Sequence, residues 1–229
     1  MLTAIIVAGG SSRRMGFDKT FAALDGQPVL VHSVAAFEAA PRVHDIIVVA
    51  RAERLEELRG LFEAQHFTKL RAVIAGGARR QDSVSEGLRH VGGDREFIAV
   101  HDAARPLVTP AQIERVHEAA QRHSAAALAA PVTDTLKRAD AGRLVTESVE
   151  REGLFAMQTP QIFARDLLAA AYKQVADEEI TITDEVSAVE RLGRKVVLVP
   201  SDDFNFKITF PVDLELAELV LKLRASKGR

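Results

Sequence analysis

The segment TAIIVAGGSSRRMGFDK, residues 3–19, joins a short apolar run to a loop rich in glycine and positive charge. The apolar run at residues 3–8 contains β-branched side chains and predicts a buried β-strand. The loop after it carries Gly9, Gly10 and Gly16 together with two arginines and a lysine. Glycines let a backbone approach a ligand and point N–H groups at it, and Arg and Lys neutralise negative charge. The segment therefore has the means to hold a polyphosphate.

Short apolar runs alternate with helical patterns along most of the chain. The predicted strands are residues 45–50, Leu70–Ala75, residues 97–100 and Ala125–Pro131, with a short strand-like segment at residues 205–209. The predicted helices are Val29–Ala39, residues 52–65, residues 83–91, Pro110–His123, a helix after Thr183, and residues 211–223. Continuous apolar strands separated by helices are typical of a mostly parallel sheet covered on both faces. The pattern predicts one α/β domain spanning residues 1–229.

Residues 133–153, TDTLKRADAGRLVTESVEREG, interrupt this alternation. Polar and apolar residues alternate on both sides of Asp140-Ala141-Gly142, which predicts a β-hairpin with its turn at these residues. The hairpin is too polar to be an internal pair of strands. Because an isolated hairpin is marginally stable in water, we expect it to pack against another surface, such as a second copy of the chain.

Composition restricts the class of protein. Of 229 residues, 47% are hydrophobic and 27% charged, with a formal net charge of −2, so no overall field favours nucleic acid or anionic lipid. Trp is absent and aromatic residues make up 5%, which argues against a platform for stacking bases. The lack of Cys excludes disulfides, thiolate catalysis and zinc–sulfur sites, and fits a cytoplasmic location. No apolar run approaches the ~18 residues of a membrane span, so no membrane partner is expected.

Glycine- and cation-bearing segments follow several predicted strands, where parallel sheets bind ligands. They are GGARRQDS at residues 76–83, HDAARP at residues 101–106 and NFKIT at residues 205–209, in addition to the first loop. Each alone has a simpler interpretation: a solvated helix start, a local Asp–Arg pair, or a lysine at a strand edge. Together they favour a phosphate-rich ligand, and a nucleotide above all.

Other chemistries lack their motifs. The first loop has neither the G-x-x-x-x-G-K-[ST] phosphate loop nor the G-x-G-x-x-G dinucleotide fingerprint, which disfavours a nicotinamide-dependent dehydrogenase. There is no G-x-S-x-G for a nucleophilic serine and no H-E-x-x-H for zinc. His101 is interpreted as a structural histidine at a strand end.

Nearly the whole chain resembles the 2-C-methyl-D-erythritol 4-phosphate cytidylyltransferases of the non-mevalonate isoprenoid pathway. The resemblance is carried, in the family's order, by AGGSSRRMGFDK, GGARRQDSVSEGL, VHDAARP, APVTDTLKR, QTPQIF, ITDEVSAVE and NFKITFPVDLELAE. It implies a Rossmann-like fold of the nucleotide-diphospho-sugar transferase type with a projecting hairpin arm. It also implies CTP and methylerythritol phosphate as substrates, Mg²⁺ held mainly through the CTP phosphates, and a homodimer formed through the arm.

The reaction implied by the resemblance is attack of the acceptor's phosphate on the α-phosphorus of CTP, with release of pyrophosphate. A phosphate monoester has a second pKa of about 6 and is largely dianionic at neutral pH, so it needs no general base. The difficulty lies in bringing several negative charges together. A site rich in Arg and Lys and poor in His suits that chemistry.

The resemblance assigns roles to individual residues. The catalytic candidates are Arg14, Lys19 and Lys207. The CTP-binding candidates are Ala8, Gly9, Gly10, Gly77, Ser83, Asp102, Ala103 and Arg105. The candidates for binding methylerythritol phosphate are Thr135, Arg151, Thr159 and Thr183. In the family, the positions of Thr135 and Arg151 lie on or beside the arm and serve the partner subunit's site, so residues 133–153 are expected to form a dimerisation arm that completes it.

This sequence departs from the family's motifs at two places, and two alternative functions remain open. The first loop, with Gly16-Phe17-Asp18 before Lys19, is closer to the variant of molybdopterin nucleotidyltransferases. Ala78 and Gln81 leave base selection in the third loop to backbone groups and Ser83. One alternative is a cytidylyltransferase for another polyol phosphate, such as ribitol 5-phosphate. Another is a non-catalytic nucleotide-binding protein on the same scaffold.

Overall fold

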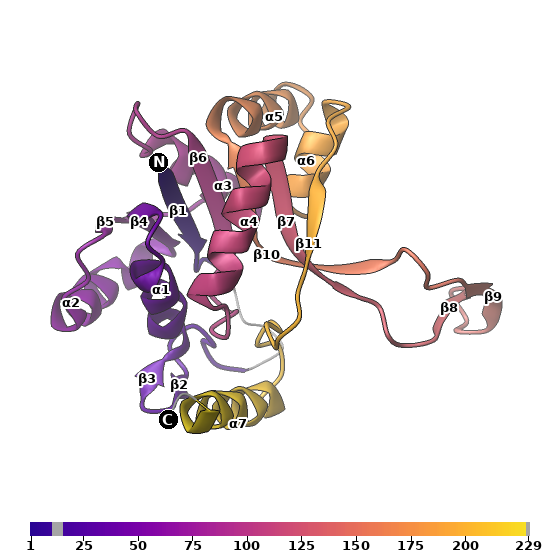
Figure 1. Cartoon of the computed structure of the whole chain (residues 1–229), viewed down its shortest axis with the longest axis horizontal. Helices are drawn as coiled ribbons and strands as arrows, with labels where there is room; N and C mark the ends of the chain where they lie inside the picture. Colours follow the sequence, from indigo (N-terminus) through magenta and orange to yellow (C-terminus); the bar gives the residue numbers. More distant parts are fainter. Residues whose placement is uncertain (11–15, 228–229) are drawn as a thin grey trace.

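The computed structural model describes residues 1–10 and 16–227 and contains a seven-stranded sheet in the order β11-β7-β10-β6-β1-β4-β5 (Figure 1). The strands are β1 (Leu2–Val7), β4 (Val43–Ala50), β5 (Leu70–Ala75), β6 (Phe97–Asp102), β7 (Ala125–Pro131), β10 (Phe155–Ala164) and β11 (Val197–Pro200). Every pair is parallel except the two that involve β10. The predicted mostly parallel sheet is confirmed.

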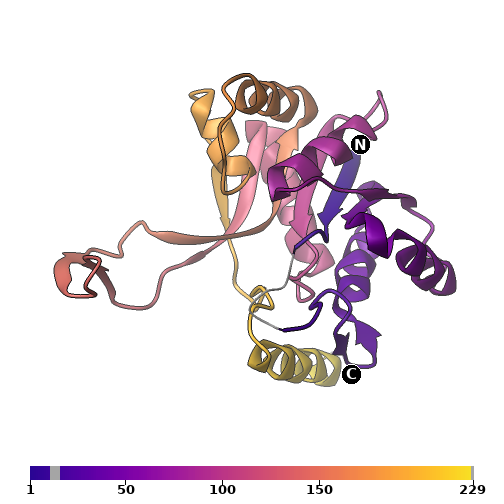
Figure 2. The same ribbon diagram turned by 180° about the vertical axis from the view of Figure 1, so that it is seen from behind.

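Helices cover both faces of this sheet, as predicted. They are α1 (Val29–Ala39), α2 (Leu55–Gln65, after the 3₁₀ turn Ala52–Arg54), α3 (Arg80–Arg89), α4 (Pro110–His123), α5 (Arg165–Asp177), α6 (Glu185–Arg191) and α7 (Val212–Lys227). Side chains of β1 alternate between two cores: Ile6 packs with residues of α1, α2 and α4, and Ile5 with residues of α3, α5 and α6. Figure 1 shows α1 and α4 in front of the sheet, and Figure 2 shows α3 and α5 on the opposite face.

Several predicted elements have the observed bounds, including α1, β5, α4 and β7. The cap predicted for α4 is also present: the Thr109 hydroxyl accepts a hydrogen bond from the Gln112 backbone N–H at 3.2 Å, and the Gln112 side chain accepts one from the Thr109 N–H at 3.0 Å. No helix among the described residues is long and apolar enough to cross a membrane.

The strand-like prediction for residues 205–209 was wrong. This segment has no strand assignment and crosses the end of the sheet as an extended loop, fixed by the Ile208 N–H donating to the Ala104 carbonyl at 2.8 Å. Conversely, β10, β11 and α5 were not predicted. β10 contains the polar stretch Gln158 to Gln161, which hides its strand character even though its second half is buried.

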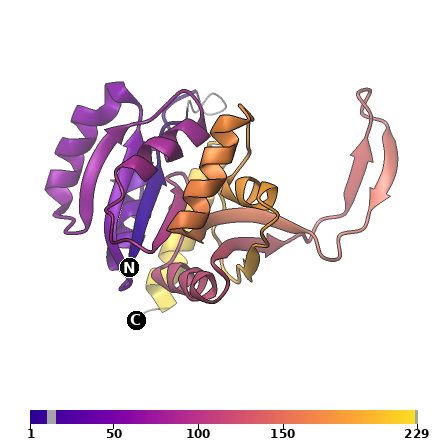
Figure 3. The same cartoon turned by 90° about the horizontal axis from the view of Figure 1, so that it is seen from above.

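The predicted hairpin projects from the body as an arm (Figures 1 and 3). Its strands are β8 (Leu136–Ala139) and β9 (Val145–Val149), which pair antiparallel. The turn lies where Asp140-Ala141-Gly142 predicted it, closed by the Arg143 N–H donating to the Asp140 carbonyl at 3.0 Å. A minor hairpin, β2 (Ala23–Leu24) and β3 (Gln27–Pro28), lies beside α7.

Candidate active site

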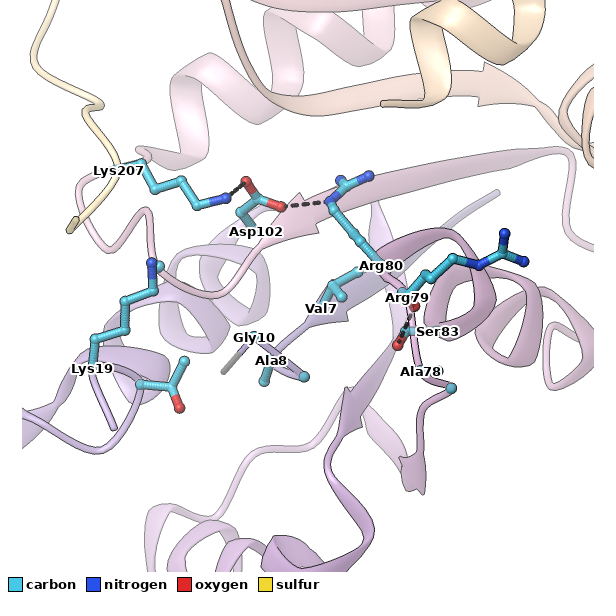
Figure 4. Close-up of a pocket in the computed structure, with 14 residues that line it drawn as sticks. Val7, Ala8, Gly10, Lys19, Ala78, Arg79, Arg80, Ser83, Asp102 and Lys207 are labelled. Carbon is cyan, nitrogen blue, oxygen red and sulfur yellow. Dashed lines mark hydrogen bonds and ion pairs between the residues drawn. The ribbon is translucent and has the colours of Figure 1, made fainter. Parts of the chain in front are cut away.

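The loops after β1, β5 and β6 meet beyond the carboxyl ends of these strands and enclose a cavity of about 380 Å³ (Figure 4). Its lining includes eight of the predicted site residues: Ala8, Gly9, Gly10, Lys19, Gly77, Ser83, Asp102 and Lys207. Val7, Thr20, Ala78, Arg79, Arg80 and Ala104 complete the lining. The structure thus brings the glycine- and cation-bearing segments to one place, as the parallel sheet predicted.

The two glycines after β5 let this loop fold tightly onto the start of α3. A Cβ atom on Gly76 would lie 2.4 Å from the Ser83 hydroxyl oxygen, and one on Gly77 would lie 2.4 Å from Asp82 Cβ. The Ser83 hydroxyl donates to the Arg79 carbonyl at 3.2 Å. The loop therefore presents backbone groups and a small hydroxyl to the cavity, consistent with recognition through backbone contacts.

A buried carboxylate, Asp102, stands at the end of β6 between two cations. Its Oδ1 accepts from Arg80 Nε at 3.0 Å and its Oδ2 accepts from Lys207 Nζ at 2.7 Å (Figure 4). Burial by itself would raise the pKa of Asp102, but the charges of Arg80 and Lys207 hold it well below the ordinary value. Asp102 is therefore ionised and positions cations; it is no proton donor.

Lys19 reaches the same cavity from the first loop. Its Nζ donates to the Ile208 carbonyl at 2.8 Å, one residue from Lys207. The preceding Asp18 accepts hydrogen bonds from the Thr20 N–H at 3.2 Å and the Thr20 hydroxyl at 2.7 Å, and pairs with Arg51. Lys19 therefore lies on the same side of the cavity as Lys207, across from Arg79 and Ser83 (Figure 4).

A second cavity of about 290 Å³ adjoins the first. It is lined by Thr159 and Thr183, which were predicted to bind the acceptor, and by Arg105, which was predicted to bind CTP but does not line the first cavity. Met157, Gln158, Gln161 and Asp184 also line it. Arg80, Asp102 and Lys207 line both cavities. Two adjoining cavities with a charged boundary provide space for two ligands whose anionic groups meet at that boundary.

Several predicted residues of the second cavity are engaged with the protein. The Thr159 hydroxyl accepts from the Asp102 N–H at 3.1 Å and hydrogen-bonds His101 Nδ1 at 2.9 Å. Arg105 donates to the Asn205 carbonyl at 2.9 Å and the Met157 carbonyl at 3.2 Å, tying the extended loop to β10. The carbonyl of Arg105 lies 3.2 Å from His101 Nε2, and burial lowers the pKa of His101 to about 3. This histidine is neutral and structural, as predicted.

Three predicted residues among those that the structure describes line neither cavity: Ala103, Thr135 and Arg151. Ala103 is fully buried, with its N–H donating to the Val7 carbonyl and its carbonyl accepting from Ser33 Oγ. Thr135 lies just before β8 and Arg151 just after β9, where the Arg151 guanidinium donates to the Thr133 carbonyl. Figure 3 shows this arm extending away from the body. Arg14 lies outside the described residues.

Sequence reasoning missed the importance of Arg80 and did not include Glu185. Arg80 was interpreted as a possible solvated helix start, but its side chain is only 27% exposed and forms two hydrogen bonds to Glu185, at 2.7 and 2.9 Å. Burial opposes its charge, yet Glu185 and Asp102 raise the pKa of Arg80 above its ordinary value. Arg80 lies in the motif GGARRQ and Glu185 in the motif TDE. Nothing in either motif alone indicates that the two side chains form an ion pair.

Comparison with known proteins identifies the family of this chain. The profile of the 2-C-methyl-D-erythritol 4-phosphate cytidylyltransferase family matches residues 2–223. The chain belongs to this family. A 2-C-methyl-D-erythritol 4-phosphate cytidylyltransferase of Dehalococcoides mccartyi is 41% identical over 227 residues, covering 99% of this chain and 96% of that protein. One of Salinibacter ruber is 43% identical over 218 residues, covering 95% and 91%.

Solved structures of cytidylyltransferases share the fold described above. The 2-C-methyl-D-erythritol 4-phosphate cytidylyltransferase of Thermus thermophilus superimposes with a TM-score of 0.80 at 31% identity, over 95% of this chain and 98% of that one. The 4-diphosphocytidyl-2C-methyl-D-erythritol synthase of Anaerococcus prevotii gives 0.85 at 27% identity, over 96% of each chain. This chain is therefore an enzyme of the nucleotidyltransferase class.

Proposed function

We propose that the protein transfers the cytidylyl group of CTP to 2-C-methyl-D-erythritol 4-phosphate, forming 4-diphosphocytidyl-2-C-methyl-D-erythritol and pyrophosphate. The observation that carries this proposal is the pair of adjoining cavities whose shared boundary holds Lys207, Asp102 and Arg80. CTP would occupy the cavity beside the glycine loops, and the acceptor would occupy the cavity lined by Thr159 and Thr183. Family membership supports both assignments.

The reacting groups are then phosphates that meet at the boundary. An oxygen of the acceptor phosphate forms a bond to the α-phosphorus of CTP, the bond from that phosphorus to the bridging oxygen breaks, and pyrophosphate leaves. Because the nucleophile is already anionic at neutral pH, with a second pKa of about 6, no side chain has to remove a proton. Lys207 and Lys19 would stabilise the charge that develops on the phosphates, and Arg14 would complete the clamp on the triphosphate.

Mg²⁺ is part of the proposal and would come with the triphosphate. Among residues 1–10 and 16–227, no group of three acidic or histidine side chains is arranged to hold a metal ion. Asp102 is already paired with three cations, Arg80, Arg105 and Lys207. Such a site fits an ion that takes most of its ligands from phosphate oxygens and water, as Mg²⁺ commonly does. The ion would neutralise phosphate charge.

The proposed active form is a homodimer joined by the arm at residues 133–153. Thr135 and Arg151 flank the two strands of the arm and line neither cavity of their own chain, so they would contact acceptor in the partner's site. Sedimentation of the intact chain tests this directly, with a dimer expected and a monomer contradicting it. A cytoplasmic location belongs to the same proposal and rests on the cysteine-free composition.

The test of the reaction is a panel of acceptors with CTP and Mg²⁺, scored by release of pyrophosphate. The panel contains methylerythritol phosphate, ribitol 5-phosphate and glycerol 3-phosphate, each repeated with ATP, GTP and UTP. Release with CTP and methylerythritol phosphate is expected. Pyrophosphate release with ribitol 5-phosphate alone would show that ribitol 5-phosphate is the acceptor. No release with any combination of nucleotide and acceptor would favour a non-catalytic nucleotide-binding protein.

A further inference from the structure

Arg80 bridges two carboxylates that come from different parts of the chain. Its Nε donates to Asp102 Oδ1 at 3.0 Å, while Nη1 and Nη2 donate to the two oxygens of Glu185 at 2.7 and 2.9 Å. Asp102 ends β6, Arg80 begins α3 and Glu185 begins α6. The planar fork of a guanidinium suits such a bridge, whereas a lysine ammonium could not hold the same three directions.

Glu185 is the most deeply buried charge in this arrangement. Its side chain is 0% exposed, and both of its oxygens accept hydrogen bonds from Arg80. The Tyr172 hydroxyl of α5 also donates to Oε1 at 2.9 Å. Glu185 lines neither cavity and therefore lies behind Arg80 as seen from the ligands. Its contacts fix the guanidinium from the side away from the reaction.

Substrate binding would disturb the front of this network. Lys207 is 38% exposed and is held by Asp102 at 2.7 Å, but phosphates in either cavity would attract its ammonium group. A buried carboxylate that loses its cation is strongly destabilised. Arg80 prevents that outcome, because it keeps its hydrogen bond to Asp102 at 3.0 Å when Lys207 turns toward the phosphates, and Arg105 adds a weaker ion pair at 3.9 Å.

We infer that Arg80 and Glu185 are positioning residues, which hold Asp102 in place so that Lys207 is aimed at the boundary between the two cavities and can move from Asp102 to the phosphates. The inference rests on the proposed function, since it needs Lys207 to act on substrate. Two positive groups, Arg80 and Lys207, face two negative ones, Asp102 and Glu185, in a chain of contacts. Of these four side chains, Lys207 is the most open to solvent.

A purely structural role is the competing explanation, because the same bonds link α3 to α6. Both explanations predict that Glu185→Gln lowers the free energy of unfolding. They differ in the dependence on Lys207. If Arg80 and Glu185 act through Lys207, replacing them should not lower turnover further once Lys207 is absent. A structural defect would lower turnover whether or not Lys207 is present.

The test is a double-mutant cycle measured on the full-length folded enzyme with CTP and the acceptor. Variants are E185Q, K207A and E185Q/K207A, with R80K replacing E185Q in a second cycle in case E185Q does not fold. We expect E185Q or R80K alone to lower kcat by roughly ten- to a hundredfold, the scale of a misplaced catalytic group. In the K207A background the same change should lower kcat by less than about twofold, since coupled residues are not additive.

The control is R89A, on the same helix as Arg80, where an exposed guanidinium pairs with Glu86 and lines neither cavity. It should leave kcat unchanged in both backgrounds. Fully multiplicative losses in the E185Q and K207A cycle, or wild-type kcat in both E185Q and R80K, would overturn the inference. An inactive wild-type enzyme would instead count against the proposed function.

Discussion

The charged groups at the boundary of the two cavities and those on the arm are held in opposite ways. Asp102 and Glu185 are buried and receive hydrogen bonds from cations on other elements. On the arm, Arg138 and Glu147 pair at 3.0 Å across neighbouring strands, and both side chains are at least 60% exposed. The charges at the boundary are therefore held by contacts within one chain, whereas those on the arm are open to solvent.

The largest effect is expected from K207A. Removing a cation from the place where phosphates meet should lower kcat by about 10²–10³-fold, comparable to the loss of one oxyanion donor. The free energy of unfolding should change by at most about 1 kcal/mol, because Lys207 is partly exposed and Asp102 keeps Arg80. Steady-state kinetics and urea unfolding measure the two quantities. K222A on α7 is the control, and wild-type turnover in K207A would contradict the assignment.

The arm is tested by mixing two inactive chains. R151A should lower kcat/KM for the acceptor by roughly tenfold or more, as expected when a charged hydrogen bond to a phosphate is lost. If Arg151 serves the partner's site, a dimer of one R151A chain and one K207A chain has one site with both defects and one intact site. Mixtures that exchange subunits should then recover roughly a quarter of the wild-type activity.

The control for this mixture is K19A with K207A, in which both defects lie in the same cavity. No intact site can form in such a mixed dimer, so activity should stay at the level of the separate variants. Failure of R151A and K207A to complement would mean that the arm serves its own chain or no site at all.

A smaller effect is expected on stability at acid pH, because a buried histidine outside the site has a lowered pKa. His117 of α4 is 2% exposed and packs edge-on against Phe97 at 5.3 Å, and burial lowers its pKa from 6.5 to about 4. Between these values the unfolded chain takes up a proton that the folded chain does not. The free energy of unfolding should therefore fall as the pH drops through this window, by roughly 1–3 kcal/mol from this residue.

Urea unfolding across this pH range, compared between wild type and H117L, measures the contribution. The variant should show a shallower decline with acid, with a remainder from His101. An identical slope in both proteins would show that the folded and unfolded chains take up the His117 proton over the same pH range, and would contradict the lowered pKa.

The smallest effect is expected on the arm surface. E147Q removes the exposed partner of Arg138, and such pairs contribute about 0–1 kcal/mol. The midpoint of thermal unfolding should thus shift by no more than about 2–4 °C in a protein of this size. A larger loss of stability would mean that Glu147 is covered in the assembled protein.

The parts of the fold that the sequence predicted are those with a local signal. β7 is a continuous apolar run, and α4 carries its cap in Thr109 and Gln112, so both had the observed bounds. β10 lacked such a signal because it contains polar residues such as Gln161. This side chain is buried only because it forms hydrogen bonds at the start of α6, more than twenty residues away.

In the site, too, residues with a local sequence signal were predicted and those without one were not. Lys19 and Asp102 follow strands of the parallel sheet, which predicted their meeting, whereas Lys207 joins them from a loop that was predicted as a strand. Glu185 could not be found in this way, because a glutamate at the start of a helix usually faces solvent. Its burial results from Arg80, more than one hundred residues earlier, and from Tyr172 of a helix that was not predicted.

The central claim is that the acceptor's phosphate attacks the α-phosphorus of CTP at this boundary. The direct measurement is phosphorus NMR of the reaction with acceptor labelled with ¹⁸O in its phosphate group. The account predicts unlabelled pyrophosphate and a diphosphate product that retains all of the label, including the bridging oxygen. Release of CMP, with the label in a polyphosphate on the acceptor, would show attack at another phosphorus and contradict the account.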